Sequence, residues 1–260
     1  MIMTDSRPFL VYLAVKYRGD YDKIITALEL REQAPIKKIM RVNASLKCKT
    51  LTILDYDYPL RLKQIPFPPL VLFYYGDISL LDNEQTLAVV GSRKYDDYGK
   101  SCTEKIVSEI AKGRVIISGL AQGIDTFAHE CAIASGGRTI AVLGSGIDYC
   151  WPIENQDLYE RIKENHLVIS EYPWKSPPYG NHFPMRNRII IGLSNGVYVP
   201  QINSYQSGTM ISFVMAAEMN KDVFVAPYPL ENETVNNRLI DEGASITIDG
   251  KTILTDLRWR

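Results

Sequence analysis

Histidine and cysteine are scarce in this sequence, which holds three histidines and four cysteines. The cysteines are Cys48, Cys102, Cys131 and Cys150, and no two of them form a C-x-x-C pair. Their wide spacing matches no zinc motif, and no grouping of histidine with cysteine or aspartate suggests another metal site. We therefore expect reduced thiols, as in a cytoplasmic protein, and no bound metal.

The sequence also has no long hydrophobic run and almost no net charge. Its apolar segment from Phe9 to Val15 is too short to span a membrane and lacks the pattern of a cleaved signal peptide. The formal net charge is −1, although residues 1–50 hold ten Lys/Arg and only five Asp/Glu. We expect a cytoplasmic protein with no membrane partner. Any anion site in the larger part must be built locally, because no overall field supplies it.

Three common enzyme signatures are absent. No G-x-x-x-x-G-K-[ST] occurs, which excludes a P-loop ATPase. Neither Ser118 nor Ser145 lies in a G-x-S-x-G elbow, which argues against a serine hydrolase. Gly144 and Gly146 match part of a dinucleotide fingerprint, but the third glycine is missing, and no acidic residue closes a strand about twenty residues after Gly91. The sequence therefore predicts no nicotinamide or other cofactor.

What the sequence does contain is a regular alternation of short apolar runs and helical segments. The predicted strands lie at 70–75, 87–90, 115–118, 139–143, 167–170, 196–200, 222–226 and 245–248. The predicted helices lie near 98–112, 124–135, 155–165, 185–193, 208–219 and 234–242. Alternation at this spacing predicts an α/β fold with a doubly wound, mainly parallel sheet and right-handed crossovers.

Two shorter parts precede this alternating region. Residues 1–52 carry apolar side chains at helical spacing, such as Leu10 and Leu13, and predict a small all-α domain. Residues 53–85 contain several X-Pro pairs, which forbid a long helix and predict a connector that begins the large domain. The large domain is expected over 86–260. The basic residues of the first part predict either a solvated helical surface or an accessory contact with nucleic acid or protein.

Three of the predicted strands are followed, where a helix begins, by turns that contain small residues. The residues of these turns are Gly91, Ser92, Arg93 and Lys94, then Ser118 and Gly119, and finally Ser207, Gly208 and Thr209. Glycine lets an anion approach the backbone, helix starts offer free N–H groups, and arginine is suited to phosphate. Because such turns meet at one edge of a parallel sheet, they predict a shared phosphate site. Tight turns with an exposed arginine are the alternative.

A second polar cluster lies at a predicted helix start later in the chain. Arg186, Asn187 and Arg188 come shortly after Phe183. Such groups are costly to bury without a partner, so a ligand or a carboxylate must neutralise them. We expect the arginines to hold phosphates and Phe183 to stack on an unpaired base. Salt bridges to Glu171 or other carboxylates are the alternative.

Six motifs occur in order along the chain. They are Val89-Val90-Gly91-Ser92-Arg93, Ser118-Gly119-Leu120-Ala121-x-Gly123-Ile124-Asp125, Gly137-x-Thr139-Ile140-Ala141-Val142-Leu143-Gly144-x-Gly146-x-Asp148, Ser170-Glu171-Tyr172-Pro173, Asn181-x-Phe183-Pro184-x-Arg186-Asn187-Arg188-Ile189-Ile190 and Ser207-Gly208-Thr209. In these motifs, and in the proline-containing segment from Tyr58 to Pro69, the sequence resembles the DprA/Smf family of bacterial DNA-processing proteins. The resemblance extends over roughly residues 54–250.

The resemblance implies an extended Rossmann-like domain preceded by a SAM-like helical domain, with no enzymatic activity. It implies binding of single-stranded DNA, protection of incoming strands in natural transformation, loading of RecA, and homodimers. It also implies that the three small-residue turns and the Arg186–Arg188 cluster form the DNA pocket. Two departures are visible: Pro200-Gln201 replaces a Glu-Ala pair common in relatives, and we expect the winged-helix domain that ends many relatives to be missing.

The dimer surface of the family lies near the end of the Rossmann-like domain. In this sequence that location points to Leu239, Ile240 and Ile246, which would form an exposed apolar patch in a monomer. Ordinary packing of these residues in the core is the alternative.

Two other functions are compatible with this fold. A nucleotide phosphoribohydrolase of the lysine-decarboxylase-like group requires P-G-G-x-G-T-x-x-E, but after Gly208-Thr209 the next glutamate is Glu218. A sensor of a mononucleotide would use the same pocket. For the preferred function, Arg93→Ala or Arg186→Ala is expected to weaken DNA binding and to lower its salt dependence by about one unit each.

Overall fold

A computed structural model describes residues 5–174, 176–229 and 234–257 of the chain. The α-helices of this part are α1 (Arg7–Lys16), α2 (Tyr21–Glu29), α3 (Ile36–Ser45), α4 (Leu60–Lys63), α5 (Asp97–Ile110), α6 (Ile124–Ala134), α7 (Gln156–Asn165), α8 (His182–Leu193), α9 (Gly208–Glu218), α10 (Val235–Asp241) and α11 (Gly250–Asp256). The strands are β1 (Lys49–Thr52), β2 (Val71–Gly76), β3 (Thr86–Val89), β4 (Val115–Ser118), β5 (Arg138–Gly146), β6 (Leu167–Tyr172), β7 (Gly196–Val199), β8 (Asp222–Val225) and β9 (Ser245–Ile246). Short 3-10 helices lie at Ile78–Asp82 and Ile153–Asn155.

The strands of the described residues form one sheet in the order β1-β2-β6-β5-β4-β3-β7-β8-β9. Strands β3 to β9 are parallel, whereas β1 and β2 join antiparallel at one side. In the centre, Ala88 of β3 lies opposite Ile117 of β4 and Val197 of β7. The chain therefore winds outward from β3 to β6 on one side and from β7 to β9 on the other. The predicted fold class, a doubly wound α/β sheet, is confirmed.

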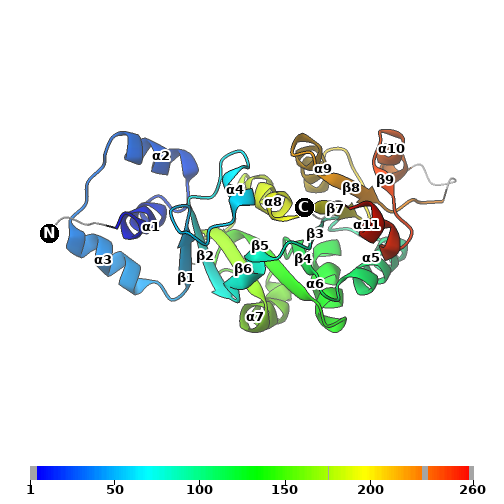
Figure 1. The fold of residues 1–260 in the computed structure, drawn as a ribbon, viewed down its shortest axis with the longest axis horizontal. Coiled ribbons are helices and arrows are strands. Elements are labelled where there is room, and N and C mark those ends of the chain that lie inside the picture. The colour runs from blue at the N-terminus through cyan, green and yellow to red at the C-terminus, as the bar shows by residue number, and fades with distance from the viewer. Residues whose placement is uncertain (1–4, 175, 230–233, 258–260) are drawn as a thin grey trace.

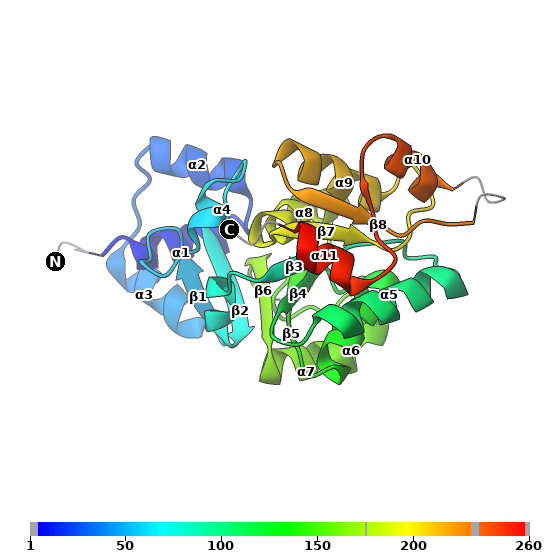
Figure 2. The same cartoon turned by 45° about the vertical axis from the view of Figure 1, so that its right-hand side comes forward.

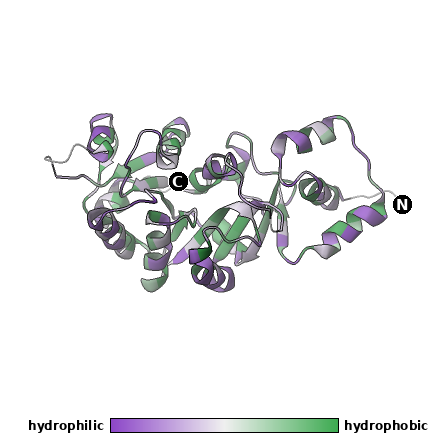
Figure 3. Cartoon of the chain, turned by 180° about the vertical axis from the view of Figure 1, so that it is seen from behind, coloured by the Kyte–Doolittle hydropathy of each residue, from purple (hydrophilic) through white to green (hydrophobic). Residues whose placement is uncertain are grey.

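Helices cover both faces of this sheet. One face packs against α5, α6 and α11 through a core that includes Leu87, Ile106 and Ile116. The other packs against α8, α9 and α10 through Ala88, Ile190 and Leu239, and the two layers are visible in Figures 1 and 2. Burial on both faces explains why the central strands are rich in apolar residues, as the hydropathy colouring shows (Figure 3).

The first three helices pack beside β1 and β2 at one end of the molecule (Figure 1). Their apolar side chains, such as Leu13, Ile24 and Ile39, form a core with Phe73 of β2. The Asn43 side chain donates to the Pro8 carbonyl at 2.9 Å and ties α3 to the start of α1.

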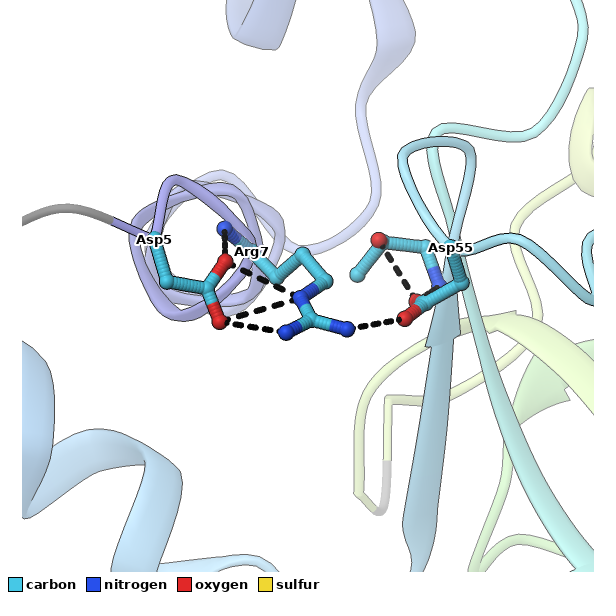
Figure 4. Close-up of polar contacts among 4 residues, drawn as sticks. Asp5, Arg7 and Asp55 are labelled. Atoms are coloured by element: carbon cyan, nitrogen blue, oxygen red, sulfur yellow. Dashed lines mark hydrogen bonds and ion pairs between the residues drawn. The ribbon is translucent and has the colours of Figure 1, made fainter.

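A polar bridge joins the start of α1 to the loop after β1 (Figure 4). The Arg7 guanidinium donates to Asp5 at 2.7 Å and to Asp55 at 3.0 Å, and Asp55 in turn accepts from the amide and hydroxyl of Thr52, both at 2.7 Å. Half of the Arg7 side chain is exposed, so we assign this bridge little stability and a role in orientation.

The structure departs from the predicted pattern in three places. Lys49–Thr52 forms a strand inside the segment expected to be all-α, because its backbone pairs with the edge of β2. Helix α11 was not expected; Asp249 caps its start by accepting from the Thr252 amide. Helix α8 begins three residues early, at His182.

The domain boundaries at residues 52 and 85 stay predictions. Within the described residues, no helix combines the length and apolarity needed to span a bilayer.

Candidate nucleic-acid interface

A pocket of about 500 Å³ opens at the carboxyl edge of the sheet, where the winding direction reverses between β3 and β7. Its walls come from the turn after β3, the start of α6, the first turns of α8 and the segment that leads into α9. Doubly wound sheets bind ligands in this crevice, and pockets of roughly 300–1,000 Å³ accept small molecules or parts of larger ones.

The turn after β3 is tied to the loop after β7 and leaves two cations exposed. The Ser92 amide donates to the Gln201 carbonyl at 2.9 Å, and the Ser92 hydroxyl donates to the Lys94 carbonyl at 2.6 Å. Ser92 therefore shapes the turn with its own hydroxyl proton. Arg93 and Lys94 are exposed, and the Arg93 guanidinium carbon lies 5.2 Å from the centroid of the Phe183 ring. This cation–π contact holds the arginine charge against the pocket wall.

Glycine is required in this turn mainly by packing. A Cβ on Gly91 would lie 2.6 Å from side-chain atoms of Ile124, at the start of α6. Gly123 has a φ of +86°, and a Cβ there would lie 2.6 Å from the Ser92 carbonyl oxygen. The turn after β3 and the start of α6 thus fit together only without side chains at these two positions.

The turn after β4 packs behind the pocket, against Arg186. Ser118 is fully buried, and its hydroxyl donates to the Val89 carbonyl at 2.7 Å. A side chain on Gly119 would collide with the Arg186 guanidinium. Neither Ser118 nor Gly119 lines the pocket; together they provide the space in which Arg186 lies.

Arg186 forms the floor of the pocket and is only 4% exposed. Its guanidinium donates to the Gly119 carbonyl at 2.7 Å and to the Val142 carbonyl. Asp125 lies beside it and accepts from the Gly119 amide at 3.1 Å and the Ala121 amide at 3.4 Å.

Burial governs the charges of this floor. It lowers the pKa of Arg186 to about 10, although the Asp125 carboxylate opposes the shift. It also raises the pKa of Asp125, against the opposing effects of Arg186 and the backbone donors. The floor therefore holds a desolvated guanidinium that is bonded to backbone carbonyls, with the buried carboxyl group of Asp125 nearby.

Arg188 points away from the pocket and forms an ion pair. Its guanidinium binds Glu171 with two bonds of 2.7 and 2.6 Å, and both side chains are less than a tenth exposed. The same group also donates to the Phe67 and Met185 carbonyls. Burial alone would lower the pKa of Arg188, but the Glu171 carboxylate raises it overall. The structure thus contains the salt bridge that the sequence offered as the alternative, and Arg188 is not among the residues that line the pocket.

The remaining wall joins α8 to the start of α9. The Asn187 side chain donates to the Gly208 carbonyl at 3.3 Å. Ser207 is the N-cap of α9 and accepts from the Met210 amide at 3.2 Å. Thr209 is buried, while Gly208 is exposed at the wall. A helix of eleven residues therefore begins at the pocket with its positive end.

The lining suits a ligand that combines an anionic group with an apolar surface. Two exposed cations and the start of α9 face a cavity that Phe183 and Ile190 also line. The one carboxyl group among the lining residues, that of Asp125, is bound by backbone amides. Within the described residues, no group of three or more potential ligands could hold a metal ion.

Comparison with known proteins identifies the family. A model of the DNA recombination-mediator protein A family matches residues 49–258. DNA processing protein DprA of Streptococcus pneumoniae strain R6 is 40% identical over 215 residues, and the protein of the same name in Bacillus subtilis strain 168 is 38% identical over 229 residues. The chain belongs to this family. The matches cover 82% and 86% of the chain and 76% and 77% of these relatives.

Solved structures of the family have the same fold. The X-ray structure of DprA from Streptococcus pneumoniae superimposes with a TM-score of 0.84 at 31% identity and full coverage of both chains. A structure of DNA processing protein A from Helicobacter pylori, described for its single-stranded DNA binding mode, gives 0.74 at 32% identity. It covers 83% of this chain and 99% of its own. The resemblance to the DprA/Smf family is confirmed.

The structure gathers most of the predicted site residues of this family member around one pocket. The residues brought together are Gly91, Ser92, Arg93, Lys94, Phe183, Arg186, Asn187, Ser207, Gly208 and Thr209. Ser118, Gly119 and Arg188 do not line it. The lining residues that the sequence did not suggest are Val90, Ala121, Asp125, Gly180, Pro184, Ile190, Asn203 and Ser212. In the sequence, Asp125 stands out only as the last residue of the second motif.

The three candidate dimer residues do not form one patch. Leu239 is fully buried in the core, so its expected exposure is wrong. Ile240 is partly buried and packs against the same core. Ile246 is 51% exposed on β9, the last strand of the sheet, and Ile248 beside it is 64% exposed. The helical periodicity of α10 turns Leu239 inward, which single residue types could not reveal.

Proposed function

We propose that this protein binds single-stranded DNA in the β3/β7 pocket, protects the strand in the cytoplasm and loads RecA onto it in natural transformation. The observation that carries the proposal is the placing of Arg93 and Lys94, both exposed, beside Phe183 and the start of α9 in one pocket. The relative from Helicobacter pylori, whose structure is described for its single-stranded DNA binding, supports the same ligand here.

The geometry favours a single strand over a duplex. Arg93, Lys94 and the N–H groups at the start of α9 are placed to bind phosphate oxygens. Phe183 lies at the same wall and can contact a base only when that base is not stacked in a duplex. No described lining residue is a histidine or a cysteine, and Asp125 is held by two amides, so we assign the pocket binding without catalysis.

Arg93→Ala is expected to weaken binding of single-stranded DNA about tenfold and to lower the slope of log affinity against log salt by about 0.7, as for one lost phosphate contact. The exposed charge is removed while the turn keeps its Ser92 hydrogen bonds. Fluorescence anisotropy with a labelled strand at several salt concentrations measures both quantities.

Lys112→Ala provides the matched control for Arg93. Lys112 is also exposed, but it lies between α5 and β4, at the opposite edge of the sheet. Equal affinity and equal salt slope for the wild type and Arg93→Ala would refute the proposed pocket. A loss of affinity in both variants would indicate a general effect of charge.

The family description as a recombination mediator supports RecA as the partner. RecA filament growth on a single strand, followed with and without this protein, tests the proposal. Faster nucleation is expected with the wild type and should be lost with Arg93→Ala. Nucleation that the wild type leaves unchanged would remove RecA loading from the proposed function while leaving DNA binding intact.

We also propose a homodimer that uses the β9 end of the sheet. Ile246 is exposed on the edge strand β9 and Ile248 on the bend that follows it, where a second copy would cover them. Ile246→Asp is expected to shift the protein to a monomer, measured by sedimentation velocity. The control is Leu54→Asp, because Leu54 is 55% exposed on the distant loop after β1. A monomeric wild type, or a dimer that Ile246→Asp leaves intact, would rule out this interface.

A further inference from the structure

A basic segment lies at the start of the chain, almost entirely before the residues that the family model matches. Residues 33–54 hold no aspartate or glutamate. Their five basic residues are Lys37, Lys38, Arg41, Lys47 and Lys49, and all five are exposed. We call these five residues the α3 basic face. They extend from the first turn of α3 to the start of β1.

The α3 basic face differs from its surroundings in lacking ion pairs. On α1 and α2, Lys16 pairs with Glu32 at 2.7 Å and Lys23 pairs with Asp20 at 2.6 Å. Among the described residues, no carboxylate lies within ion-pair distance of any member of the α3 basic face. The described cations of α1 and α2 named above are thus ion-paired, whereas those of the α3 basic face are not, although Lys38 lies 5.7 Å from the centroid of the Tyr12 ring.

Two charges of the α3 basic face are also unfavourable for the dipole of α3. Lys37 and Lys38 lie in the first turn of α3, where the helix dipole favours anions, and that turn has no acidic residue. Pro35 precedes it and supplies no capping side chain. Two cations at the positive end of an uncapped helix lower its stability, and a bound polyanion would reverse that effect.

The rest of α3 argues against a membrane or an ordinary protein interface. Its apolar residues Ile39, Val42 and Leu46 pack inward against the core of the first helices, so no apolar face is left for a bilayer. Met40 is the one large apolar side chain of the helix that is more than half exposed. Protein interfaces centre on an apolar core, whereas a surface of unpaired cations fits a polyanion.

The first helices also contact the edge of the sheet that carries the pocket. A Cβ on Gly19, between α1 and α2, would lie 2.5 Å from the Glu171 carbonyl oxygen and 2.8 Å from the Tyr172 ring. Tyr172 stacks on His182 at 3.8 Å, and His182 precedes Phe183 of the pocket. The α3 basic face is therefore carried by a unit that contacts the end of β6, and Tyr172 and His182 connect that contact to Phe183 at the pocket wall.

We propose that the α3 basic face is a second contact for single-stranded DNA, which holds the part of a strand that extends beyond the pocket. This inference rests on the proposed function of the pocket. The contact is made to phosphates and is independent of sequence, because Tyr12, the aromatic ring beside Lys38, is buried and cannot stack on a base. It predicts that affinity depends on strand length, since only a long strand reaches both sites.

The test uses the double variant Lys37→Ala/Arg41→Ala in the full chain, with strands of about 6 and about 30 nucleotides. Both side chains are solvent-exposed on α3, so the fold should be retained, and the melting temperature verifies this. For the long strand, affinity should fall about fivefold to tenfold and the salt slope should drop by about 1.4. For the short strand, affinity should equal that of the wild type.

The control and the pocket variant separate the possible outcomes. Lys112→Ala/Lys251→Ala removes two exposed lysines elsewhere and should bind both strands as the wild type does. Unchanged binding of the long strand by the α3 variant would overturn the inference while Arg93→Ala still reports on the pocket. A wild type that binds neither strand would refute the proposed function itself. Normal DNA binding with lost RecA loading in the α3 variant would instead assign the face to an acidic protein, and overturn it as a DNA contact.

Discussion

Replacing Arg188 with alanine is expected to lower the free energy of unfolding by about 3–5 kcal/mol, the typical loss when one partner of a buried ion pair is removed. Glu171 would keep its charge at 7% exposure with no cation beside it. The Phe67 and Met185 carbonyls would each lose a donor as well. Denaturation with urea, followed by far-UV circular dichroism, measures the difference.

A neutral pair distinguishes the charge from the packing. Glu171→Gln combined with Arg188→Met removes both charges and keeps most of the volume, so it should recover much of the lost stability. DNA affinity per folded molecule should be unchanged in the neutral pair, because Arg188 does not line the pocket. An Arg188→Ala variant of normal stability with weakened DNA binding would instead place this arginine on the ligand.

Arg186→Ala is expected to reduce both stability and DNA binding, by a route different from that of Arg93. The variant removes the guanidinium that donates to the Gly119 and Val142 carbonyls and that lies near the buried Asp125 carboxyl group, at a cost of about 3 kcal/mol or more. The turn after β4 would then lose the group that fills the space above Gly119, and the pocket floor would collapse. Affinity for a single strand should fall more than tenfold.

The salt dependence separates the two arginines. Arg186 is 4% exposed and bonded to backbone carbonyls, so its loss releases few counterions, and the slope should stay close to that of the wild type. This result would replace the expectation from the sequence that the loss of either arginine lowers the slope of log affinity against log salt by about one unit. A slope reduced as strongly as in Arg93→Ala would show that Arg186 reaches a phosphate directly.

The order of strands and helices could be predicted from the sequence because it depends on short-range hydrophobic patterns and turn residues. The runs that became β3, β4 and β7 are buried along their whole length and mostly apolar, because both faces of each strand are covered by helices. Small residues stand where each strand turns into a helix, and the parallel arrangement brings those turns to one edge. The location of the pocket follows from these two facts alone. The short β1 was missed because a four-residue strand acquires its partner only from the distant β2.

The sequence by itself determined the fold class, the family and the edge of the sheet at which the pocket lies, since these depend on periodicity and on residues that are close along the chain. Only the tertiary structure decided which cations are free. Arg93, Arg186 and Arg188 look alike in sequence, but burial beside Glu171 makes Arg188 one half of an ion pair, and burial beneath Gly119 makes Arg186 a support of the floor. Arg93 alone of the three is exposed at the wall. The role of a charge depends on which distant groups desolvate or neutralise it, and that is a property of packing.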